Sequence, residues 1–510
     1  MNKIRTALIS VWDKTGLVDL AKFLNKKNIK IISTGGTKKI LKDNGIDVVS
    51  ISEITNQKEV MNGRVKTLHP KIFGGILANR ENKSHIDDLK DMQGKFIDLV
   101  VVNLYPFVGE AVRKNLDMDK AIEYIDIGGP SMLRAAAKNY KDIIPLCNPN
   151  QYKDFITSFN NNDGFFSKSD RKNYALEIFK LTHQYDKNIF KFFSKDDDDE
   201  SNKIEFKLKK VDDLRYGENP HQKASFYLSE NEKKSWIQYH GKQLSYNNYY
   251  DIETAFSIVN EFNETCCVII KHSNPCGFSL GKNPRHAYLS AVETDPVSYF
   301  GGIVAFNSEV DYQAAIEINK SFLECIVAKS FSKRALLELK KKKNLRLITI
   351  NERSKNNKII KSVFNGFLIQ DKDNFDEDFD SFEIVSKIKP DNQQLKALHL
   401  SWKLVKYVKS NAIVFSNDRQ LIGVGAGQMS TIDAAKIAIE KAKDSKLVLE
   451  NSVMASDAFF PFADCITLAA GYGVKGVIHP GGSINDQEVI DEVNKYSMFM
   501  LITKKRHFNH

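Results

Sequence analysis

The sequence has no long apolar run and no pair of cysteines at metal-ligand spacing. No segment approaches the ~18 apolar residues that a membrane-spanning helix needs, and the N-terminus lacks the apolar core of a signal peptide. The six cysteines are scattered and form no Cys-x-x-Cys pair, which favours reduced thiols in or near hydrophobic cores. We therefore expect a cytoplasmic protein that does not associate with membranes.

A strong charge imbalance is also missing. The 510 residues include 74 basic and 64 acidic side chains, so the net charge of +10 is small for the length. Basic clusters such as Lys340–Lys343 and Lys504–Arg506 are separated and lack interleaved aromatic residues, unlike a nucleic-acid-binding face. The hydrophobic content of 42% is enough for folded cores. These features disfavour nucleic-acid binding and fit small anionic substrates at least as well.

The first 150 residues alternate short β-branched runs with amphipathic segments. This alternation predicts an α/β fold with a parallel sheet, whose ligands lie beyond the carboxyl ends of the strands. Strands are expected at 4–11, 29–32, 47–51 and 98–102. An acidic run at 196–200 and a polar stretch at 371–380 are typical of connectors. We predict three domains, at 1–197, 198–375 and 376–510; the sequence does not show whether the later two are duplicates.

Ser33–Thr37 reads Ser-Thr-Gly-Gly-Thr between an expected strand and an expected helix. The two glycines let a ligand approach the backbone closely, and a helix N-terminus offers free amides. This pattern is typical of a phosphate-binding loop, although it is not a Walker loop. On this motif alone, an ordinary strand-to-helix turn with a threonine cap is the slightly simpler interpretation.

Three further segments of the first domain carry reactive side chains. Residues 63–70 read Gly-Arg-Val-Lys-Thr-Leu-His-Pro; in an extended stretch Arg64 and Lys66 point to the same side, which suits a phosphate or an oxyanion. Asn-Leu-Tyr at 103–105 follows an expected strand, and Asp-Ile-Gly-Gly-Pro-Ser at 126–131 opens a helix that ends near Lys138. Ordinary structure also explains each segment alone, since a late cation such as Lys138 complements the helix dipole.

Lys-His-Ser-Asn-Pro-Cys-Gly at 271–277 follows a buried strand expected at 266–270. An imidazole moves protons near neutral pH, and an adjacent ammonium can hold a developing negative charge. A catalytic turn and a plain β-turn explain this segment equally well. A zinc deaminase is rejected because Ser279 occupies the second cysteine position and no His-x-Glu occurs, so we expect no catalytic metal.

Three more polar segments lie in the C-terminal part. Residues 214–222 form a dense polar loop, and the glycine-rich run at 422–428 lacks the spacing of a dinucleotide fingerprint. Residues 456–464, Ser-Asp-Ala-Phe-Phe-Pro-Phe-Ala-Asp, pair an aromatic platform with carboxylates that suit a flat heterocycle. A core corner with surface acids explains them equally well.

Together these motifs resemble one family, the bifunctional purine biosynthesis proteins, which join phosphoribosylaminoimidazolecarboxamide (AICAR) formyltransferase to inosine monophosphate (IMP) cyclohydrolase. The resemblance covers essentially the whole chain in order. It implies formyl transfer from 10-formyltetrahydrofolate to the AICAR amine by the C-terminal part, then dehydrative closure of formyl-AICAR to IMP by the N-terminal part. It also implies a methylglyoxal-synthase-like N-terminal domain, two cytidine-deaminase-like α/β units without zinc, and a homodimer with transformylase sites at the subunit interface.

The resemblance assigns the transformylase chemistry to three residues. The AICAR amine is a poor nucleophile because it is conjugated, so a base must remove its proton as the new bond forms. His272 is implied as that base, Lys271 as the stabiliser of the oxyanion, and Asn411 as the group that orients the formyl. The AICAR site is expected at Arg215, Tyr216, Asn248, Gly301, Glu324 and Arg506, and the folate site at Ile432, Phe459, Asp464, Gly481 and Gly482.

The cyclohydrolase needs proton transfer and charge stabilisation but no prosthetic group. The resemblance implies Lys138 as proton donor or acceptor, with Lys66, Tyr105 and Asp126 around the reacting group. The nucleotide is expected to contact Ser10, Lys14, Ser33, Thr34, Gly35, Gly36, Arg64, Thr67, Asn103 and Gly128.

The chain departs from the family pattern at three positions. Thr431 stands where a folate-contacting arginine is expected, Ala463 where an arginine often precedes the pterin-side acid, and Trp12 where a small residue is usual. We expect these changes, Thr431 and Ala463 above all, to affect folate affinity and polyglutamate preference more than the reaction. Two alternatives stay open: a chain with only one live activity, the folate half being the weaker candidate, and a nucleotide-binding module without turnover.

Overall fold

The computed structural model describes residues 3–61, 64–195, 203–351, 357–373 and 378–510. The chain divides into two compact units, Met1–Glu205 (unit 1) and Phe206–His510 (unit 2). Gly63, the acidic run at 196–200 and the domain boundaries expected at 197/198 and 375/376 lie outside the described residues, so those boundaries stay predictions.

Unit 1 is built on a five-stranded sheet in the order β3-β2-β1-β4-β5. All of its strand pairs are parallel, as the sequence predicts. The run Leu99–Val102 is buried at every position, as expected for a central strand covered on both faces. The strands are β1 (Thr6–Ser10), β2 (Lys30–Ser33), β3 (Val49–Ser50), β4 (Leu99–Val102) and β5 (Ile144–Leu146).

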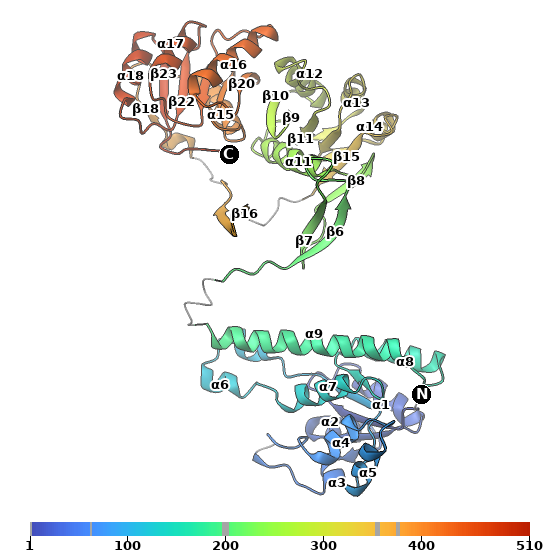
Figure 1. Ribbon diagram of the computed structural model, residues 1–510. Helices are drawn as coiled ribbons and strands as arrows, with labels where there is room; N and C mark the ends of the chain where they lie inside the picture. Colours follow the sequence, from blue (N-terminus) through green and yellow to red (C-terminus); the bar gives the residue numbers. More distant parts are fainter. Residues whose placement is uncertain (1–2, 62–63, 196–202, 352–356, 374–377) are drawn as a thin grey trace. The chain divides into compact units, whose positions relative to one another are not determined.

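Helices cover both faces of this sheet. Side chains of α1 and α8 share one hydrophobic cluster with Val101, while side chains of α4, α7 and α9 share another with Val100 on the opposite face. The 26-residue helix α9 runs along the unit (Figure 1). The helices are α1 (Leu17–Lys26), α2 (Gly35–Asp43), α3 (Ile51–Thr55), α4 (Pro70–Leu77), α5 (Lys83–Asp91), η2 (Val108–Val112), α6 (Met118–Ile122), α7 (Gly128–Lys138), α8 (Gln151–Asn161) and α9 (Lys168–Phe193).

Unit 2 contains two six-stranded mixed sheets with the same strand order. The first runs β10-β9-β11-β13-β15-β8, and the second, taken in the matching sense, runs β20-β19-β21-β22-β23-β18. In each sheet three consecutive strands are parallel and the other pairings are antiparallel. Four helices follow in the same order in both halves. The structure thus reveals an internal repeat that the sequence does not show.

The elements of the first half are β8 (Trp236–His240), α11 (Tyr246–Val259), β9 (Cys266–Lys271), β10 (Asn274–Leu280), α12 (Pro284–Thr294), β11 (Ile303–Phe306), β12 (Glu309–Val310), α13 (Tyr312–Asn319), β13 (Cys325–Ala328), β14 (Ser330–Phe331), α14 (Lys333–Leu339) and β15 (Arg346–Ile350). Those of the second half are β18 (Glu383–Ile384), α15 (Asn392–Val405), β19 (Ile413–Ser416), β20 (Leu421–Gly425), α16 (Thr431–Asp444), β21 (Val453–Ser456), α17 (Asp464–Ala470), β22 (Gly476–His479), α18 (Asp486–Lys495) and β23 (Phe499–Ile502). Two hairpins, β6 (Leu208–Leu214) with β7 (Ala224–Ser229) and β16 (Lys358–Val363) with β17 (Gly366–Asp371), and a short helix, η3 (Phe379–Ser381), complete the unit.

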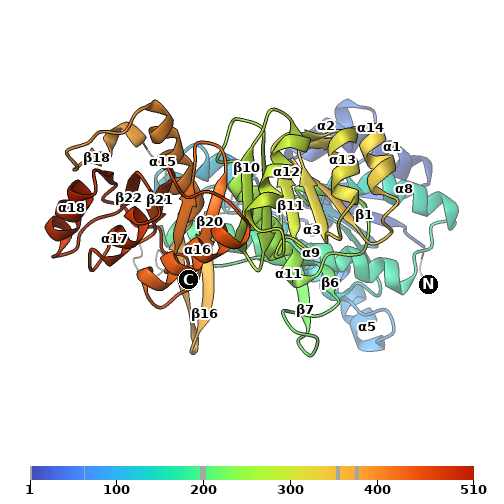
Figure 2. The same ribbon diagram turned by 90° about the horizontal axis from the view of Figure 1, so that it is seen from above.

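The two halves of unit 2 lie side by side, with the edge strands β10 and β20 facing each other (Figures 1 and 2). An isolated antiparallel bridge joins Ser279 to Gln420, and one hydrophobic cluster extends across both halves. The Lys409 backbone amide donates to the Asn274 Oδ1 atom at 2.9 Å. The turn between β9 and β10 therefore meets the chain that enters β19.

The six cysteines are buried with free thiols, in the cores where the sequence places them. Among the described residues, no helix combines the length and the apolar character that a membrane crossing needs. In the same part of the chain, no cluster of three or more His, Cys, Asp or Glu side chains has a geometry that would hold a metal ion.

Candidate active sites

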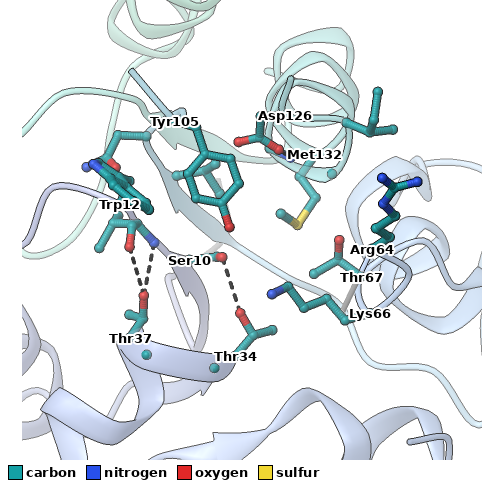
Figure 3. Close-up of a pocket in the computed structure, with 18 of the residues that line it drawn as sticks. Ser10, Trp12, Thr34, Thr37, Arg64, Lys66, Thr67, Tyr105, Asp126 and Met132 are labelled. Carbon is teal, nitrogen blue, oxygen red and sulfur yellow. Dashed lines mark hydrogen bonds between the residues drawn. The ribbon is translucent and has the colours of Figure 1, made fainter. Parts of the chain in front are cut away.

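A cavity of about 730 Å³ opens in unit 1 where strands β1, β2 and β4 end (Figure 3). Its lining includes Ser10 at the end of β1, Val11, Trp12 and Lys14 after it, Thr34 to Thr37 after β2, and Asn103 and Tyr105 after β4. The segment 64–67 and residues 122–129 form the remaining walls. Ligands of parallel α/β sheets bind at this edge, beyond the carboxyl ends of the strands.

One side of the cavity has the properties of an anion site. Helix α2 begins at Gly35, and no side chain caps its N-terminus, so the first amides are free to bind a ligand. Thr34 lies within hydrogen-bonding distance of Ser10, with 3.3 Å between their hydroxyl oxygens. Figure 3 shows the Lys66 side chain extending toward these two hydroxyls, with Arg64 on the same wall. Arg64 lies in a turn, Val65 forms an isolated bridge with Val60, and Lys66 and Thr67 lie in bends, so the segment is not a continuous extended stretch.

Tyr105 and Asp126 line the other side of the cavity, and Lys66 extends from the wall toward the α2 N-terminus (Figure 3). Asp126 is held in place because its Oδ1 atom accepts from the Gly129 amide at 2.8 Å and its own amide donates to the Tyr185 hydroxyl at 2.8 Å. Burial raises the pKa of Asp126, although backbone hydrogen bonds from Gly129 and Tyr105 and the Lys66 charge oppose this shift. The arrangement combines a cation, a hydroxyl and a carboxyl group with an unusually high proton affinity.

Asn103 connects the loops that follow β1 and β4. Its Oδ1 atom accepts from the amides of Trp12 at 2.5 Å and Asp13 at 2.9 Å, and its Nδ2 atom donates to the Asp13 carbonyl at 3.0 Å. The Lys14 ammonium donates to the Trp12 carbonyl at 3.1 Å, and burial lowers the pKa of Lys14 against the opposing charge of Asp13. The polar atoms of Asn103 thus hold the loop that follows β1. Lys14 adds a second partly buried cation to the cavity, besides Lys66.

Two residues expected at this site do not line the cavity. Ser33 is buried, and its hydroxyl donates to the Ile9 carbonyl at 2.7 Å, joining β2 to β1. Lys138 is exposed at the last position of α7, about 15 Å along the helix from Gly128. All other residues expected for the cyclohydrolase contribute to the wall. The role implied for Lys138 stays a prediction that the shape of this cavity does not support.

Further residues that line the cavity or support its wall were not anticipated as site residues. The Thr37 hydroxyl bonds both the amide and the carbonyl of Val11, Glu123 forms an ion pair with Arg64, and Tyr185 holds the Asp126 backbone. Thr37 ends the Ser-Thr-Gly-Gly-Thr motif, so a signal for it was present. Tyr185 lies 59 residues from Asp126 on α9, and only the folded chain brings the two together.

In unit 2, Lys271 and His272 lie where β9 ends. The hairpin turn consists of His272 and Ser273 alone, both with positive φ values, 50° and 59°. A two-residue turn of this kind favours Asn-Gly, so a His-Ser turn needs external support. The amide and the hydroxyl of Ser273 donate to the Asp251 Oδ1 atom at 2.7 and 3.1 Å. The turn is shorter than the 271–277 segment that we expected, because residues 274–277 belong to β10.

Several predicted transformylase residues gather at one edge of the first sheet. The Lys271 ammonium donates to the Phe300 carbonyl at 2.6 Å, and a Cβ atom on Gly301 would lie 3.3 Å from the Lys271 Nζ atom. Glu324 follows along the same edge, where the carboxylate pairs with the Arg346 guanidinium at 2.6 Å. Lys271, Gly301 and Glu324 therefore lie at the same end of three neighbouring strands, β9, β11 and β13.

Asn411 lies on the facing half of unit 2, just before β19. Its Nδ2 atom donates to the Gln428 carbonyl at 3.0 Å, and the neighbouring Ser410 hydroxyl bonds the buried Asp457 carboxylate. Burial raises the pKa of Asp457, while the Ser410 hydrogen bond opposes the shift. Since Lys409 bonds Asn274, the Asn411 segment and the His272 turn meet across the boundary between the halves.

Other predicted AICAR-site residues have local partners. The Arg215 guanidinium lies 5.5 Å from the centroid of the Tyr216 ring, and the Arg506 guanidinium lies 4.2 Å from that of Phe508. The Asn248 Oδ1 atom accepts from the Ser245 amide at 3.1 Å and so caps α11. Within the described parts of the chain, no hydrogen bond joins Arg215, Asn248 or Arg506 to Lys271.

The expected folate positions lie on two connected loops and two helices of the second half. The Asn485 Nδ2 atom donates to the Pro461 carbonyl at 2.7 Å, which connects the Phe459 loop with the Gly481–Gly482 loop. Both glycines have positive φ values, 67° and 96°, and Phe459 is exposed. Asp464 begins α17, and Ile432 packs from α16 against the core of the second half.

Comparisons with known proteins cover both units. A family model described as "AICARFT/IMPCHase bienzyme" matches residues 136–441, and one described as "MGS-like domain" matches residues 16–131. The chain is 48% identical over 509 residues to the bifunctional purine biosynthesis protein PurH of Fusobacterium nucleatum, with 99% of this chain and 100% of that protein covered. With the same coverage, PurH of Clostridium acetobutylicum is 46% identical over 510 residues and PurH of Bacillus mycoides 45% identical over 513. The chain therefore belongs to the family of bifunctional purine biosynthesis proteins, the AICARFT/IMPCHase bienzymes.

Proposed function

We propose that the unit 1 cavity closes formyl-AICAR to IMP and that the Lys271–His272 turn of unit 2 transfers the formyl group to AICAR. The observation that carries the first assignment is the pairing of a cationic, amide-rich end with Lys66, Tyr105 and Asp126 in one cavity. Its volume of about 730 Å³ lies within the range of small-molecule sites. A nucleotide fits this layout with its phosphate at the α2 N-terminus and its base toward Tyr105.

In ring closure, the carboxamide nitrogen attacks the formyl carbon and water leaves. The new C–N bond forms as the formyl oxygen gains negative charge, which the Lys66 ammonium stabilises. Asp126 accepts the proton that the nitrogen loses, since its raised pKa brings it closer to the operating pH of a proton carrier. The Tyr105 hydroxyl donates its proton to the same oxygen, which gives a cyclic carbinolamine. Asp126 then passes its proton to the new hydroxyl group, the C–O bond breaks and water leaves. The former formamide nitrogen loses its proton to the Tyr105 phenolate as the C=N bond forms, so both side chains return to their starting states. These roles are proposals supported by the shared cavity.

In formyl transfer, the exposed imidazole of His272 takes a proton from the AICAR amine as that amine attacks the formyl carbon. The tetrahedral intermediate then collapses: the bond between the formyl carbon and the folate nitrogen breaks, and this nitrogen takes up the proton from His272, so that tetrahydrofolate leaves. Lys271 has three N–H donors and uses one on the Phe300 carbonyl, so others remain for the tetrahedral oxyanion. Asn411 orients the formyl group from the facing half. The positive φ of His272 supports this assignment, because strained turns with unusual residues concentrate at functional sites.

The cosubstrate, the assembly and the compartment are part of the same proposal. We propose 10-formyltetrahydrofolate as the formyl donor, with AICAR, formyl-AICAR and IMP as the nucleotides and no prosthetic group. Phe300 and Phe322 are 59% and 47% exposed and pack together at 5.4 Å beside Lys271, which supports a homodimer whose second copy covers this edge. Buried free thiols fit a reducing cytoplasm.

The test is the coupled assay: AICAR and 10-formyltetrahydrofolate should yield IMP and tetrahydrofolate. His272→Ala should abolish tetrahydrofolate release while IMP formation from supplied formyl-AICAR survives. His286→Ala, an exposed histidine on α12 of the same half, is the matched control and should retain both activities. Equal loss of both activities in a folded His272→Ala protein would refute separate sites. Ring closure without any tetrahydrofolate release in the wild type would leave a single live activity.

A further inference from the structure

Trp12 lies against Tyr105 at the wall of the cyclohydrolase cavity (Figure 3). The two ring centroids are 4.9 Å apart with an interplanar angle of 82°, the edge-to-face geometry that aromatic pairs prefer. The indole is still 47% exposed, so it is a wall of the site rather than part of the core.

The Trp12 backbone is fixed relative to Tyr105. Its amide donates to the Asn103 Oδ1 atom at 2.5 Å, and Asn103 stands two residues before Tyr105 on the loop after β4. The Lys14 ammonium holds the Trp12 carbonyl at 3.1 Å. Because β1 and β4 are paired neighbours in the sheet, the two aromatic residues come from loops that cannot easily separate.

The Tyr105 hydroxyl lacks an equivalent anchor. Figure 3 shows it pointing into the cavity, and among the described residues no hydrogen bond to it is present. The direction of this hydroxyl thus depends on how the ring packs. Without the indole, the ring would border open cavity and could populate other χ1 rotamers.

We propose that Trp12 is a positioning residue for ring closure, which holds the Tyr105 ring so that its hydroxyl faces the reacting formyl oxygen. This inference deepens the proposed function and rests on the role of Tyr105 in it. Trp12 acts through Tyr105, so its contribution should appear in the rate of the chemical step and should vanish when the Tyr105 hydroxyl is absent.

The experiment measures ring closure from supplied formyl-AICAR with full-length Trp12→Ser, Trp12→Phe, Tyr105→Phe and the Trp12→Ser/Tyr105→Phe double variant. Trp12→Ser should lower kcat by about two- to tenfold, the range that corresponds to a lost aromatic pair, with little change in KM. Trp12→Phe should recover most of the rate. In the Tyr105→Phe background, Trp12→Ser should have no further effect. Trp236→Phe in β8 of unit 2 is the control for loss of an indole and should leave ring closure unchanged.

Each contrary result has a distinct meaning. Tyr105→Phe with a wild-type rate would overturn the proposed role of Tyr105 and, with it, this inference. A slowed Tyr105→Phe protein in which Trp12→Ser multiplies the defect would overturn the inference alone, because the indole would then act independently. A Trp12→Ser effect confined to KM would also overturn it and point to direct contact with the substrate. If Trp12→Ser fails to fold, Trp12→Leu and its combination with Tyr105→Phe provide the same cycle, because leucine keeps an apolar side chain but removes the aromatic ring.

Discussion

Gly129 is a position where one methyl group should separate the two activities. Its amide donates to the Asp126 Oδ1 atom at 2.8 Å in the first turn of α7. A Cβ atom on Gly129 would lie 2.4 Å from the Asp126 Oδ2 atom and 2.9 Å from the Leu104 Cδ2 atom. Separations this short do not occur in packed proteins, so Gly129→Ala must displace the Asp126 carboxyl group.

The size of the effect follows from these contacts. Overpacking a site costs about 1–3 kcal/mol, and losing a hydrogen bond to a charged acceptor costs about 1.5–3 kcal/mol. If about 2 kcal/mol of this cost raises the activation free energy of ring closure, the reaction slows by about 30-fold. Formyl transfer should be unchanged because His272 and Asn411 lie in the other unit.

The assay supplies formyl-AICAR and follows IMP, while tetrahydrofolate release reports formyl transfer in the same preparation. Gly109→Ala is the matched control in unit 1, because a Cβ atom there would lie 3.6 Å from the nearest atom, Pro106 Cβ, an ordinary contact. A Gly129→Ala protein with native melting behaviour and wild-type ring closure would refute the place given to Asp126. An equal loss in both variants would point to a general effect on unit 1.

Three further predictions concern the same cavity. Burial raises the pKa of Asp126 above its unfolded value, so its negative charge destabilises the folded protein at neutral pH, and this cost is relieved as pH falls through the folded pKa. Asp126→Asn should therefore slow ring closure but melt at pH 7 at a temperature no lower than that of the wild type. A lower melting temperature would contradict the raised pKa. Ser33→Ala should lower the free energy of unfolding by about 1 kcal/mol in a denaturant titration, because it deletes a buried hydrogen bond. The KM for formyl-AICAR should be unchanged, and a raised KM would show that Ser33 contacts the nucleotide after all. Lys138→Ala is expected from the family resemblance to slow ring closure and spare formyl transfer; unchanged closure kinetics would leave Lys138 only its favourable place at the C-terminus of α7.

The parallel sheet of unit 1 could be predicted from the sequence because β-branched runs and amphipathic segments alternate there with little ambiguity. The place of Asn103 and Tyr105 followed, since side chains after a buried parallel strand reach the ligand edge. The difference between Ser33 and Thr34 could not be predicted. It depends on the last residue of β2, and strand ends are uncertain from sequence by more than one position.

Contacts between segments far apart in the chain could not be predicted from the sequence either. The Tyr185 hydroxyl on α9 accepts from the Asp126 amide, and the Trp12 ring packs against the Tyr105 ring from another loop. No local sequence pattern predicts either contact. The repeat in unit 2 is likewise not visible in the residues themselves, and only the family resemblance implied two similar units. Strand order is maintained by packing, and two halves can keep the same order after their residues have diverged.

The two equivalent hairpin turns of the unit 2 repeat differ in how their polar groups are used. The β9–β10 turn exposes His272 next to Lys271, whereas polar groups of the matching β19–β20 turn bond the first half of unit 2. The Gln420 Nε2 atom donates to the Ser290 carbonyl at 2.7 Å, and the Arg419 carbonyl accepts from the Leu280 amide at 2.8 Å. The β9–β10 turn therefore leaves Lys271 and His272 available for chemistry, whereas the β19–β20 turn joins the two halves at the opposite end of β10. Substitutions in the β19–β20 turn are expected to weaken the packing between the halves before they alter chemistry.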